Sequence, residues 1–92
     1  MYILVTYDIS NDKQRKKVDK LLSEYGFRVN YSVFEIEIDT KTYTKLLQKL
    51  LDFVEKSDSV RVYRISKDMV EKSVELNPKF SHPFSKEDSY VL

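Results

Sequence analysis

The stretch "FRVNYSVFEIEID", residues 27–39, decides the fold, because apolar and polar side chains alternate along its second half. Such alternation is typical of a β-strand with one buried face. The apolar positions fall on one side: Phe34, Ile36 and Ile38. Thirteen residues are long for a single strand, so we predict a short strand, a turn near Asn30 and Tyr31, and a longer strand.

A strand and a helix are predicted before this stretch. Residues 2–9, "YILVTYDI", form an apolar run rich in β-branched and aromatic residues, as expected of a strand buried on both faces. Asn11 followed by Gln14 is a capping-box signature, and the apolar residues after it share helical spacing: Val18, Leu21, Leu22 and Tyr25. We expect this amphipathic helix to end before Gly26, the only glycine of the chain.

A second helix and a last strand are predicted after it. Asp39 or Thr40 can cap a helix whose apolar stripe is unbroken: Tyr43, Leu46, Leu47, Leu50, Leu51 and Val54. Residues 59–65, "SVRVYRI", alternate again and are predicted to form a strand. Pro78, Pro83 and a mixed polar composition indicate that the last fifteen residues lack regular structure.

The order of the elements is βαββαβ, which right-handed crossovers fold into an antiparallel sheet with both helices on one face. The sequence therefore predicts an α+β, ferredoxin-like sandwich. Ninety-two residues are enough for one domain. We place that domain at residues 1–66 and expect residues 67–92 to form a C-terminal strand and tail that contribute to a dimer.

Charge and composition narrow the setting. The 16 basic side chains nearly cancel the 15 acidic ones, but basic charge gathers in two islands, Lys13–Lys20 and Arg61–Lys67. The absence of cysteine excludes disulfides and thiolate metal sites. No apolar run is long enough to cross a membrane and no secretion signal is present, so we expect a soluble, cytoplasmic protein.

The second face of the predicted sheet is apolar. If Ile3, Val5 and Tyr7 face the helices, the alternate residues of this strand face away: Tyr2, Leu4, Thr6 and Asp8. A face-to-face homodimer would cover this surface, and its two-fold axis would place the two Asp8 residues on opposite sides of one groove. The tail would add a strand to the partner's sheet edge through its apolar residues: Val70, Val74 and Leu76.

Four strings, in order, resemble a known family. They are "YDIS" at 7–10, the basic cluster with Arg15 and Lys17, "YGFRVNYSVFE" at 25–35 and "DSVRVYRI" at 58–65. Together they closely resemble CRISPR-associated protein two, the small subunit of the spacer-acquisition machinery. The resemblance covers residues 1–66.

The resemblance implies a ferredoxin-like homodimer that bridges two dimers of the CRISPR integrase, CRISPR-associated protein one, and holds duplex DNA. It also implies a Mg²⁺-dependent endonuclease acting on RNA or DNA, with Asp8 as catalytic residue and metal ligand. The nucleic-acid contacts carried over are basic: Arg15, Lys16, Lys17 and Arg28. Lys17 occupies a position where arginine is frequent in the family, and lysine cannot form the two parallel hydrogen bonds to a phosphate that arginine forms. Asn30 occupies a position where the family commonly has glutamine.

Other interpretations of the same residues stay open. Asp8 is equally suited to turn chemistry before a helix, and Lys13–Lys20 to a solvated helix face. Phe34 alternates with core residues, so we predict a structural role, and His82 is interpreted as an ordinary tail residue.

The alternative function is a toxin-type ribonuclease resembling virulence-associated protein D. Because most aromatic positions face the core or an interface, we predict a preference for duplex over single strands.

Overall fold

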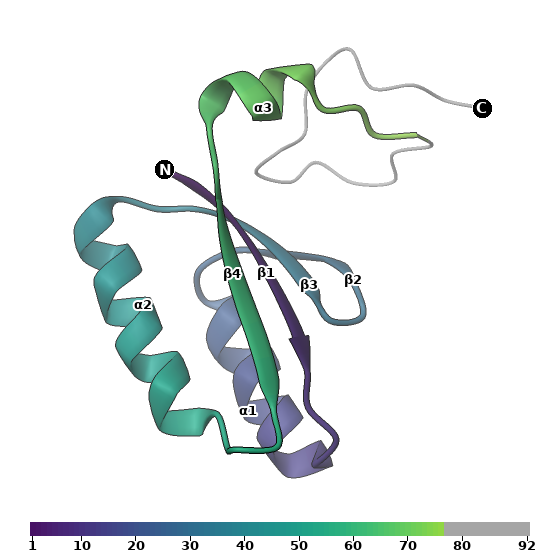
Figure 1. Cartoon of the computed structure of the whole chain (residues 1–92), viewed down its shortest axis with the longest axis vertical. Helices are drawn as coiled ribbons and strands as arrows, with labels where there is room; N and C mark the ends of the chain where they lie inside the picture. The colour runs from purple at the N-terminus through teal and green to yellow at the C-terminus, as the bar shows by residue number, and fades with distance from the viewer. Residues whose placement is uncertain (77–92) are drawn as a thin grey trace.

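The structure is a computed structural model, and it describes residues 1–76. Its elements follow one another as shown in Figure 1: β1 (Tyr2–Asp8), α1 (Asp12–Ser23), β2 (Phe27–Asn30), β3 (Val33–Glu37), α2 (Thr40–Phe53), β4 (Ser59–Ile65) and α3 (Lys67–Lys72). The predicted order βαββαβ is confirmed up to β4. The expectations for His82 and for the last fifteen residues lie outside the described residues.

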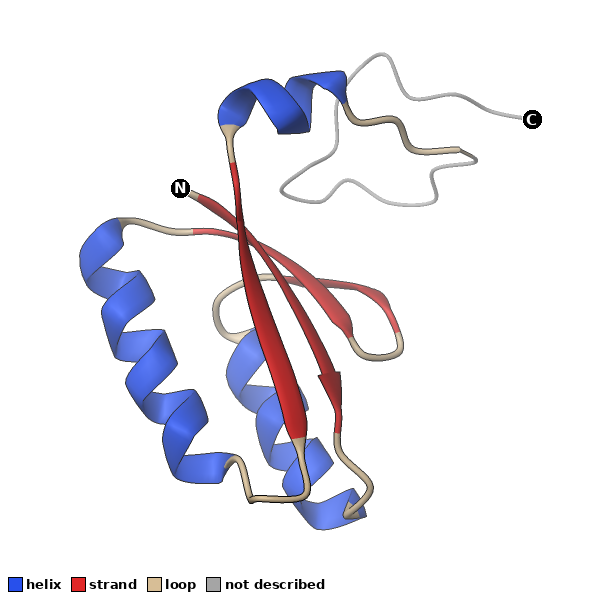
Figure 2. Ribbon diagram, in the orientation of Figure 1, coloured by secondary structure: helices blue, strands red, loops and turns tan. Residues whose placement is uncertain are grey.

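The four strands form one sheet in the order β2-β3-β1-β4, and every neighbouring pair is antiparallel. Both long helices, α1 and α2, cover the same face of this sheet (Figure 2). This arrangement confirms the α+β, ferredoxin-like sandwich. It leaves the opposite face of the sheet, which we call the outer face, without a covering helix among the described residues.

The core lies between the sheet and the two helices. Every second residue of β1 points into it, together with residues of β3 and of both helices: Ile3, Val5, Tyr7, Phe34, Ile36, Val18, Leu21, Leu22, Leu46 and Leu50. Leu51 of the predicted apolar stripe is instead 75% exposed. Phe34 is fully buried, which confirms its predicted structural role. Burial of one such side chain stabilises the folded state by about 1.5–3 kcal/mol. Each strand is therefore oriented so that the apolar residues of its alternating pattern face the helices.

Side-chain caps fix the starts of both long helices. Asn11 accepts a hydrogen bond from the Gln14 N–H at 2.9 Å, and Asp39 accepts one from the Thr42 N–H at 2.7 Å. Hydrogen bonding to Thr42 holds the pKa of Asp39 below its usual value. The Gln14 side chain does not complete a capping box; it donates to the Phe53 carbonyl at 3.0 Å and thereby ties the start of α1 to the end of α2.

Gly26 is required by a close approach of two chain segments. Its N–H donates to the Leu22 carbonyl at 2.9 Å as the chain leaves α1. A Cβ atom at this position would lie 2.2 Å from Ile36 Cγ1 and 2.5 Å from the Glu35 carbonyl oxygen. The turn after α1 can therefore pass β3 only without a side chain.

The chain after β4 differs from the prediction. Val70 was expected in a strand, but it is buried in the short helix α3. The Ser66 hydroxyl caps this helix by accepting a hydrogen bond from the Met69 N–H at 3.1 Å. Val74 and Leu76 lie beyond this helix and are exposed. None of the helices in residues 1–76 is long and apolar enough to cross a membrane.

Candidate metal and nucleic-acid site

Asp8 is the last residue of β1 and lies beside Ser59 of β4. Since the preceding Tyr7 points into the core, the Asp8 side chain lies on the outer face, where it is exposed. Within residues 1–76 its carboxylate has no hydrogen-bond or ion-pair partner. The helix cap is Asn11, so the interpretation of Asp8 as a helix-entry residue loses its main support.

The outer face contains the residues that the alternation of β1 predicted. Leu4 of β1 lies beside Tyr63 of β4 on one side and beside Glu35 of β3 on the other. Tyr2 lies between Ile65 and Glu37, and the Glu37 carboxylate raises the pKa of the Tyr2 phenol. Where β1 meets β4, the face is apolar at Leu4 and Tyr63 but polar toward Asp8, where Arg61 lies beside Thr6. Where β1 meets β3, the face is acidic.

One chain provides few ligands for a metal ion. No group of three or more His, Cys, Asp or Glu side chains gathers anywhere in the described part of the chain. Mg²⁺ prefers six oxygen ligands but keeps several waters, so it can be held by one or two carboxylates. Asp8 provides one such carboxylate, and a dimer through the outer face would place a second Asp8 across its two-fold axis.

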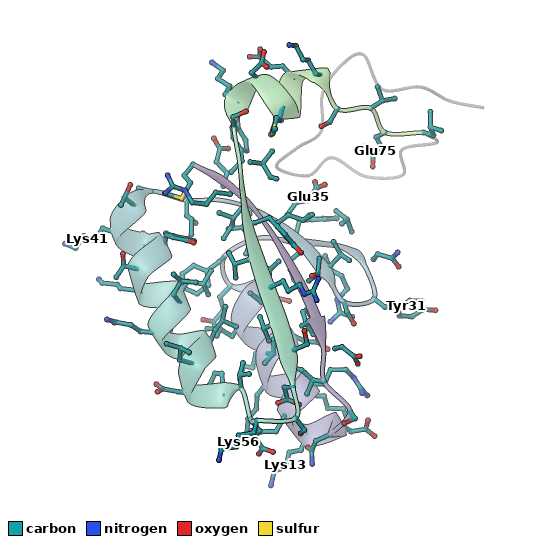
Figure 3. The ribbon with its side chains drawn as sticks, in the orientation of Figure 1. Lys13, Tyr31, Glu35, Lys41, Lys56 and Glu75 are labelled. Carbon is teal, nitrogen blue, oxygen red and sulfur yellow. The ribbon has the colours of Figure 1, made fainter. Side chains whose placement is uncertain are left out.

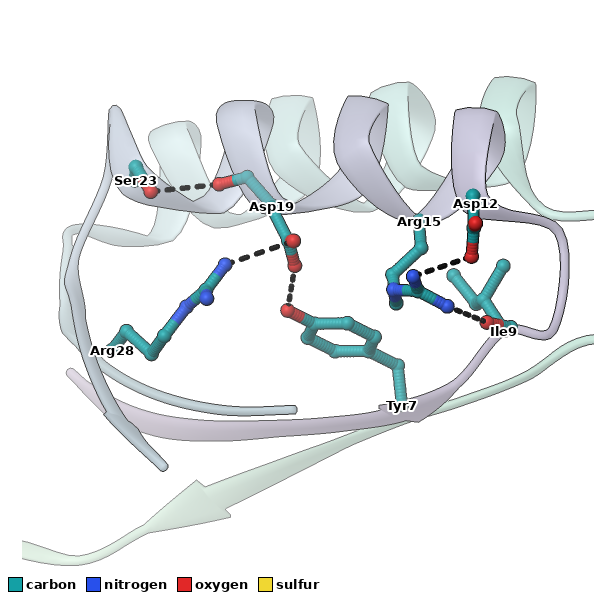
Figure 4. A network of polar contacts seen from close by, with 7 residues as sticks. All are labelled: Tyr7, Ile9, Asp12, Arg15, Asp19, Ser23 and Arg28. Atoms are coloured by element: carbon teal, nitrogen blue, oxygen red, sulfur yellow. Dashed lines mark hydrogen bonds and ion pairs between the residues drawn. The ribbon is translucent and has the colours of Figure 1, made fainter. Parts of the chain in front are cut away.

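Both predicted arginine contacts are engaged within the chain (Figure 4). Arg15 places Nη2 2.5 Å from Asp12 Oδ1, and its Nη1 donates to the Ile9 carbonyl at 3.3 Å. Arg28 places Nη2 2.9 Å from Asp19 Oδ2, and its guanidinium lies 5.5 Å from the centre of the Phe34 ring. Both arginines lie between α1 and the sheet, whereas Asp8 lies on the outer face.

Asp19 links three elements and was missed by the sequence analysis. Besides pairing with Arg28 of β2, its carboxylate accepts a hydrogen bond from the Tyr7 hydroxyl of β1 (Figure 4). Burial raises the pKa of Tyr7, and the bond to Asp19 raises it further. One signal was available in the sequence: Asp19 is an acid inside a basic run, directly after the buried Val18.

The lysines of α1 are placed differently. Lys16 and Lys17 are exposed and pair with no acid in residues 1–76. A groove of about 490 Å³ between α1 and α2 brings Lys17 near residues that the sequence analysis did not connect: Lys20, Leu21, Glu24, Lys49, Asp52 and Phe53. The predicted site residues therefore divide between the outer face, which holds Asp8, and the helix layer, which holds the cations.

One aromatic residue departs from the expected pattern. Tyr31, in the turn between β2 and β3, is 88% exposed and points away from the rest of the protein (Figure 3). Tyr63 on the outer face is 45% exposed. The prediction that aromatic residues mostly face the core or an interface holds for Tyr7 and Phe34 but not for Tyr31.

Comparison with known proteins places these features in a family. The family model described as CRISPR associated protein Cas2 matches residues 1–73. The chain belongs to the Cas2 family. The resemblance inferred from the four strings is confirmed, and the match favours this family over the toxin-type ribonuclease.

Relatives in the Cas2 family support the assignment, one of them over the whole chain. A CRISPR-associated endoribonuclease Cas2 of Chloroflexus aurantiacus is 37% identical, and the alignment covers 100% of both chains. One from Moorella thermoacetica is 41% identical over 71% of this chain and 74% of its own length. These relatives are named as endoribonucleases.

Solved structures agree with the fold. The crystal structure of Streptococcus pyogenes Cas2 at pH 6.5 superimposes with a TM-score of 0.72 at 32% identity, covering 79% of this chain and 95% of that one. A chain of a partial Cas6-RT-Cas1–Cas2 complex gives a TM-score of 0.67 at 32% identity, covering 78% of this chain and 86% of that one. The Cas2 fold is thus found in an assembly with Cas1.

Proposed function

We propose that this chain is a subunit of the CRISPR spacer-acquisition machinery, in which a homodimer binds duplex DNA and bridges dimers of the Cas1 integrase. We further propose a Mg²⁺-dependent endonuclease activity centred on Asp8. The observation that carries the proposal is the Asp8 carboxylate, which has no partner in residues 1–76 and lies at the end of a sheet face that no helix of those residues covers. The names of the relatives and the complex with Cas1 support it.

The proposed dimer follows from the outer face. Leu4, Tyr63 and Ile65 are all partly exposed there, although a β-sheet face of this composition is normally covered. A second copy of the same face covers it with a self-complementary surface, as a two-fold axis requires. In that arrangement the helix layers of both subunits stay exposed and the two Asp8 side chains lie at the same interface.

The proposed metal site consists of Asp8 from each subunit, with water supplying the other ligands. When bound, Mg²⁺ would neutralise charge on a substrate phosphate and polarise its phosphorus–oxygen bonds. The chain's own contribution is to fix Asp8 at a strand end, where β1 and β4 pair and the backbone is rigid. The neighbouring outer-face positions are polar: Ser59 lies beside Asp8, and Arg61 lies beside Thr6.

Asp8→Asn tests the catalytic part of the proposal. It keeps the shape of the side chain and removes its charge, so Mg²⁺-dependent cleavage of RNA or DNA should fall at least ~100-fold while the circular dichroism spectrum is unchanged. Asp52→Asn, which removes an exposed carboxylate from α2, is the matched control and should cleave normally. Unchanged cleavage by the Asp8 variant would assign the activity to another site or to a contaminating nuclease.

The scaffold part is tested with the same variants in a spacer-capture assay with the Cas1 partner. Asp8→Asn should still bind duplex DNA and support capture, because the phosphate contacts lie on the helix layer. Variants that lack the predicted basic contacts are tested in the same assay: Arg15, Lys16, Lys17 and Arg28. If spacer capture required Asp8 and survived the loss of these basic side chains, catalysis would replace DNA bridging as the main function.

A further inference from the structure

The turn between β2 and β3 carries an exposed aromatic ring. Tyr31 is 88% exposed, and Figure 3 shows its side chain projecting away from the sheet. Within residues 1–76 the ring stacks on no other ring and takes part in no cation–π contact. The backbone under it is fixed, because the Asn30 side chain accepts a hydrogen bond from the Tyr31 N–H at 2.8 Å. The turn therefore presents an open aromatic face to the solvent.

The register between β1 and β3 places this ring opposite Asp8. The Tyr7 N–H donates to the Ser32 carbonyl at 3.1 Å, which continues the antiparallel pairing of the two strands toward the turn. One position further along this ladder, Asp8 lies opposite Tyr31. The exposed ring and the exposed carboxylate thus lie at the same end of the sheet.

A cation lies on the other side of Asp8. Arg61 of β4 pairs with Thr6 of β1, so its side chain shares the outer face with Asp8. Arg61 is exposed and forms no ion pair in the part of the chain that the structure describes. A guanidinium at this place attracts a phosphate, and the ring of Tyr31 offers a stacking surface. Together these side chains match a phosphate and the base attached to it.

This end of the sheet stays open in the proposed dimer. The apolar centre of the outer face is the pair of Leu4 and Tyr63, whereas Asp8 pairs with Ser59 at the end of β1. The turn that carries Tyr31 lies beyond that centre. A second copy seated on the apolar centre would therefore leave an approach to Asp8 along the turn.

The geometry favours an unpaired base over a base pair. In a duplex both faces of a base are covered by its neighbours, whereas an unpaired base can rotate onto a ring that projects from a turn. A hollow of about 270 Å³ beside the ring is lined by turn residues: Arg28, Val29, Asn30 and Tyr31. This volume is less than the ~300–1,000 Å³ of sites that enclose a whole drug-sized ligand, so the hollow suits one base.

We propose that Tyr31 is a base-binding residue: its ring stacks on an unpaired base whose neighbouring phosphate lies beside Arg61 and Asp8. This inference rests on the proposed endonuclease activity and names the residue that selects a single strand for it. The preference for duplex predicted from the sequence then applies to the helix layer and not to this end of the sheet. Stacking reads the face of the base, so RNA and DNA share the required chemistry. Because relatives are named as endoribonucleases, RNA is the first probe.

The first test measures binding by fluorescence anisotropy, with a labelled single-stranded RNA of about 12 nucleotides. Every protein carries Asp8→Asn, which keeps the strand intact, and this variant is called the parent. Tyr31→Ala should weaken binding about 5- to 150-fold, the range for one lost base–aromatic stack, and Tyr31→Phe should stay within ~2-fold of the parent. Leu51→Ala, which removes a 75% exposed apolar side chain from α2, is the matched control and should bind like the parent.

The salt dependence separates stacking from charge. Tyr31→Ala removes no charge, so the slope of log K against log salt should stay at the parent value. Arg61→Gln should lower the magnitude of that slope by ~0.7, the value for one phosphate contact on a single strand. A fall for Tyr31→Ala, or no change for Arg61→Gln, would contradict the placement of the base and its phosphate.

Two further probes test which part of the nucleic acid Tyr31 contacts. A duplex of the same sequence should bind Tyr31→Ala and the parent equally, whereas single-stranded DNA should lose the same factor as RNA. An equal loss with the duplex would overturn the selection of an unpaired base. A loss confined to RNA would assign Tyr31 to the 2′-hydroxyl and overturn stacking.

Cleavage by the protein with Asp8 intact separates this inference from the proposed function. If that protein cleaves RNA in Mg²⁺ and Tyr31→Ala changes neither binding nor cleavage, the inference fails and the endonuclease stands. If it cleaves nothing but Tyr31→Ala weakens binding, base stacking stands and the endonuclease fails. If Tyr31→Ala weakens binding to Cas1 and not to RNA, the turn is a protein contact and the inference fails. A parent that binds no single strand at low salt overturns the inference as well.

Discussion

The partly buried carboxylate of Asp19 connects three elements of the fold. It accepts a hydrogen bond from Tyr7 and pairs with Arg28, so β1, α1 and β2 meet at a single side chain. The guanidinium of Arg28 also lies over the ring of Phe34, whose own ring stacks with that of Tyr7 at a centroid distance of 6.3 Å. Asp19 is therefore the residue that pairs with Arg28, whose side chain is partly exposed.

Tyr7→Phe tests this network through its pH dependence. The folded-state pKa of Tyr7 is raised above the ordinary 10.0, so its contribution is fully present below pH 10 and is lost as the pH rises further. At pH 7 the variant should be less stable by about 1–3 kcal/mol, the range for a hydrogen bond to a charged group. Urea unfolding at neutral and strongly alkaline pH should show this difference shrinking above pH 10.

Tyr31→Phe is the control for that measurement. Tyr31 is 88% exposed, so removal of its hydroxyl should leave the stability unchanged at both pH values. A constant difference in stability between wild type and Tyr7→Phe across the alkaline range would mean that folding does not raise the pKa of Tyr7.

At the scale of the elements, the strands and the helix starts could be predicted because neighbouring residues in the sequence determine them. The alternation at Phe34 and Ile36 and the caps at Asn11 and Asp39 gave the strands and the helix starts correctly. The prediction of a strand was wrong at Val70, because the Ser66 hydroxyl caps a short helix there.

The candidate site was predicted unevenly for a physical reason. Asp8 follows from its place in an alternating strand, so its exposure on the outer face could be predicted. The ion pairs of Arg15 with Asp12 and of Arg28 with Asp19 could not be predicted, because the sequence does not show which acid lies beside a given arginine in the fold. Only the fold shows which cations remain unpaired.

Gly26→Ala tests the packing of the turn after α1. The added Cβ would overlap Ile36 and the Glu35 carbonyl, so either the turn or β3 must shift. Overpacking of this kind costs about 1–3 kcal/mol, which urea unfolding would detect as a lower midpoint with an unchanged slope. Ser23→Ala, at an exposed position of α1, should change stability by less than ~0.5 kcal/mol. Equal stability of the two variants would contradict the close approach.

At the scale of the whole molecule, charge is divided between two surfaces. The exposed lysines of α1 lie on the helix layer: Lys13, Lys16, Lys17 and Lys20. The outer face carries three acids and one cation beside its apolar residues: Asp8, Glu35, Glu37 and Arg61. This division suits a protein that associates with a second copy through one surface and with a polyanion through the other. Salt should accordingly weaken DNA binding far more than dimerisation, because screening acts on the exposed charges and apolar burial is insensitive to it.

The measurement that tests the central claim most directly is sedimentation equilibrium at micromolar concentration, comparing wild type with Leu4→Glu. Leu4 lies beside Tyr63 in the middle of the outer face, so a carboxylate there would be buried without a partner in the dimer. We predict a dimeric wild type and a monomeric Leu4→Glu with a native circular dichroism spectrum. Gln48→Glu, which adds the same charge to the helix layer, should stay dimeric. A monomeric wild type, or a Leu4→Glu variant that remains a dimer, would contradict the pairing of outer faces that brings the two Asp8 residues together.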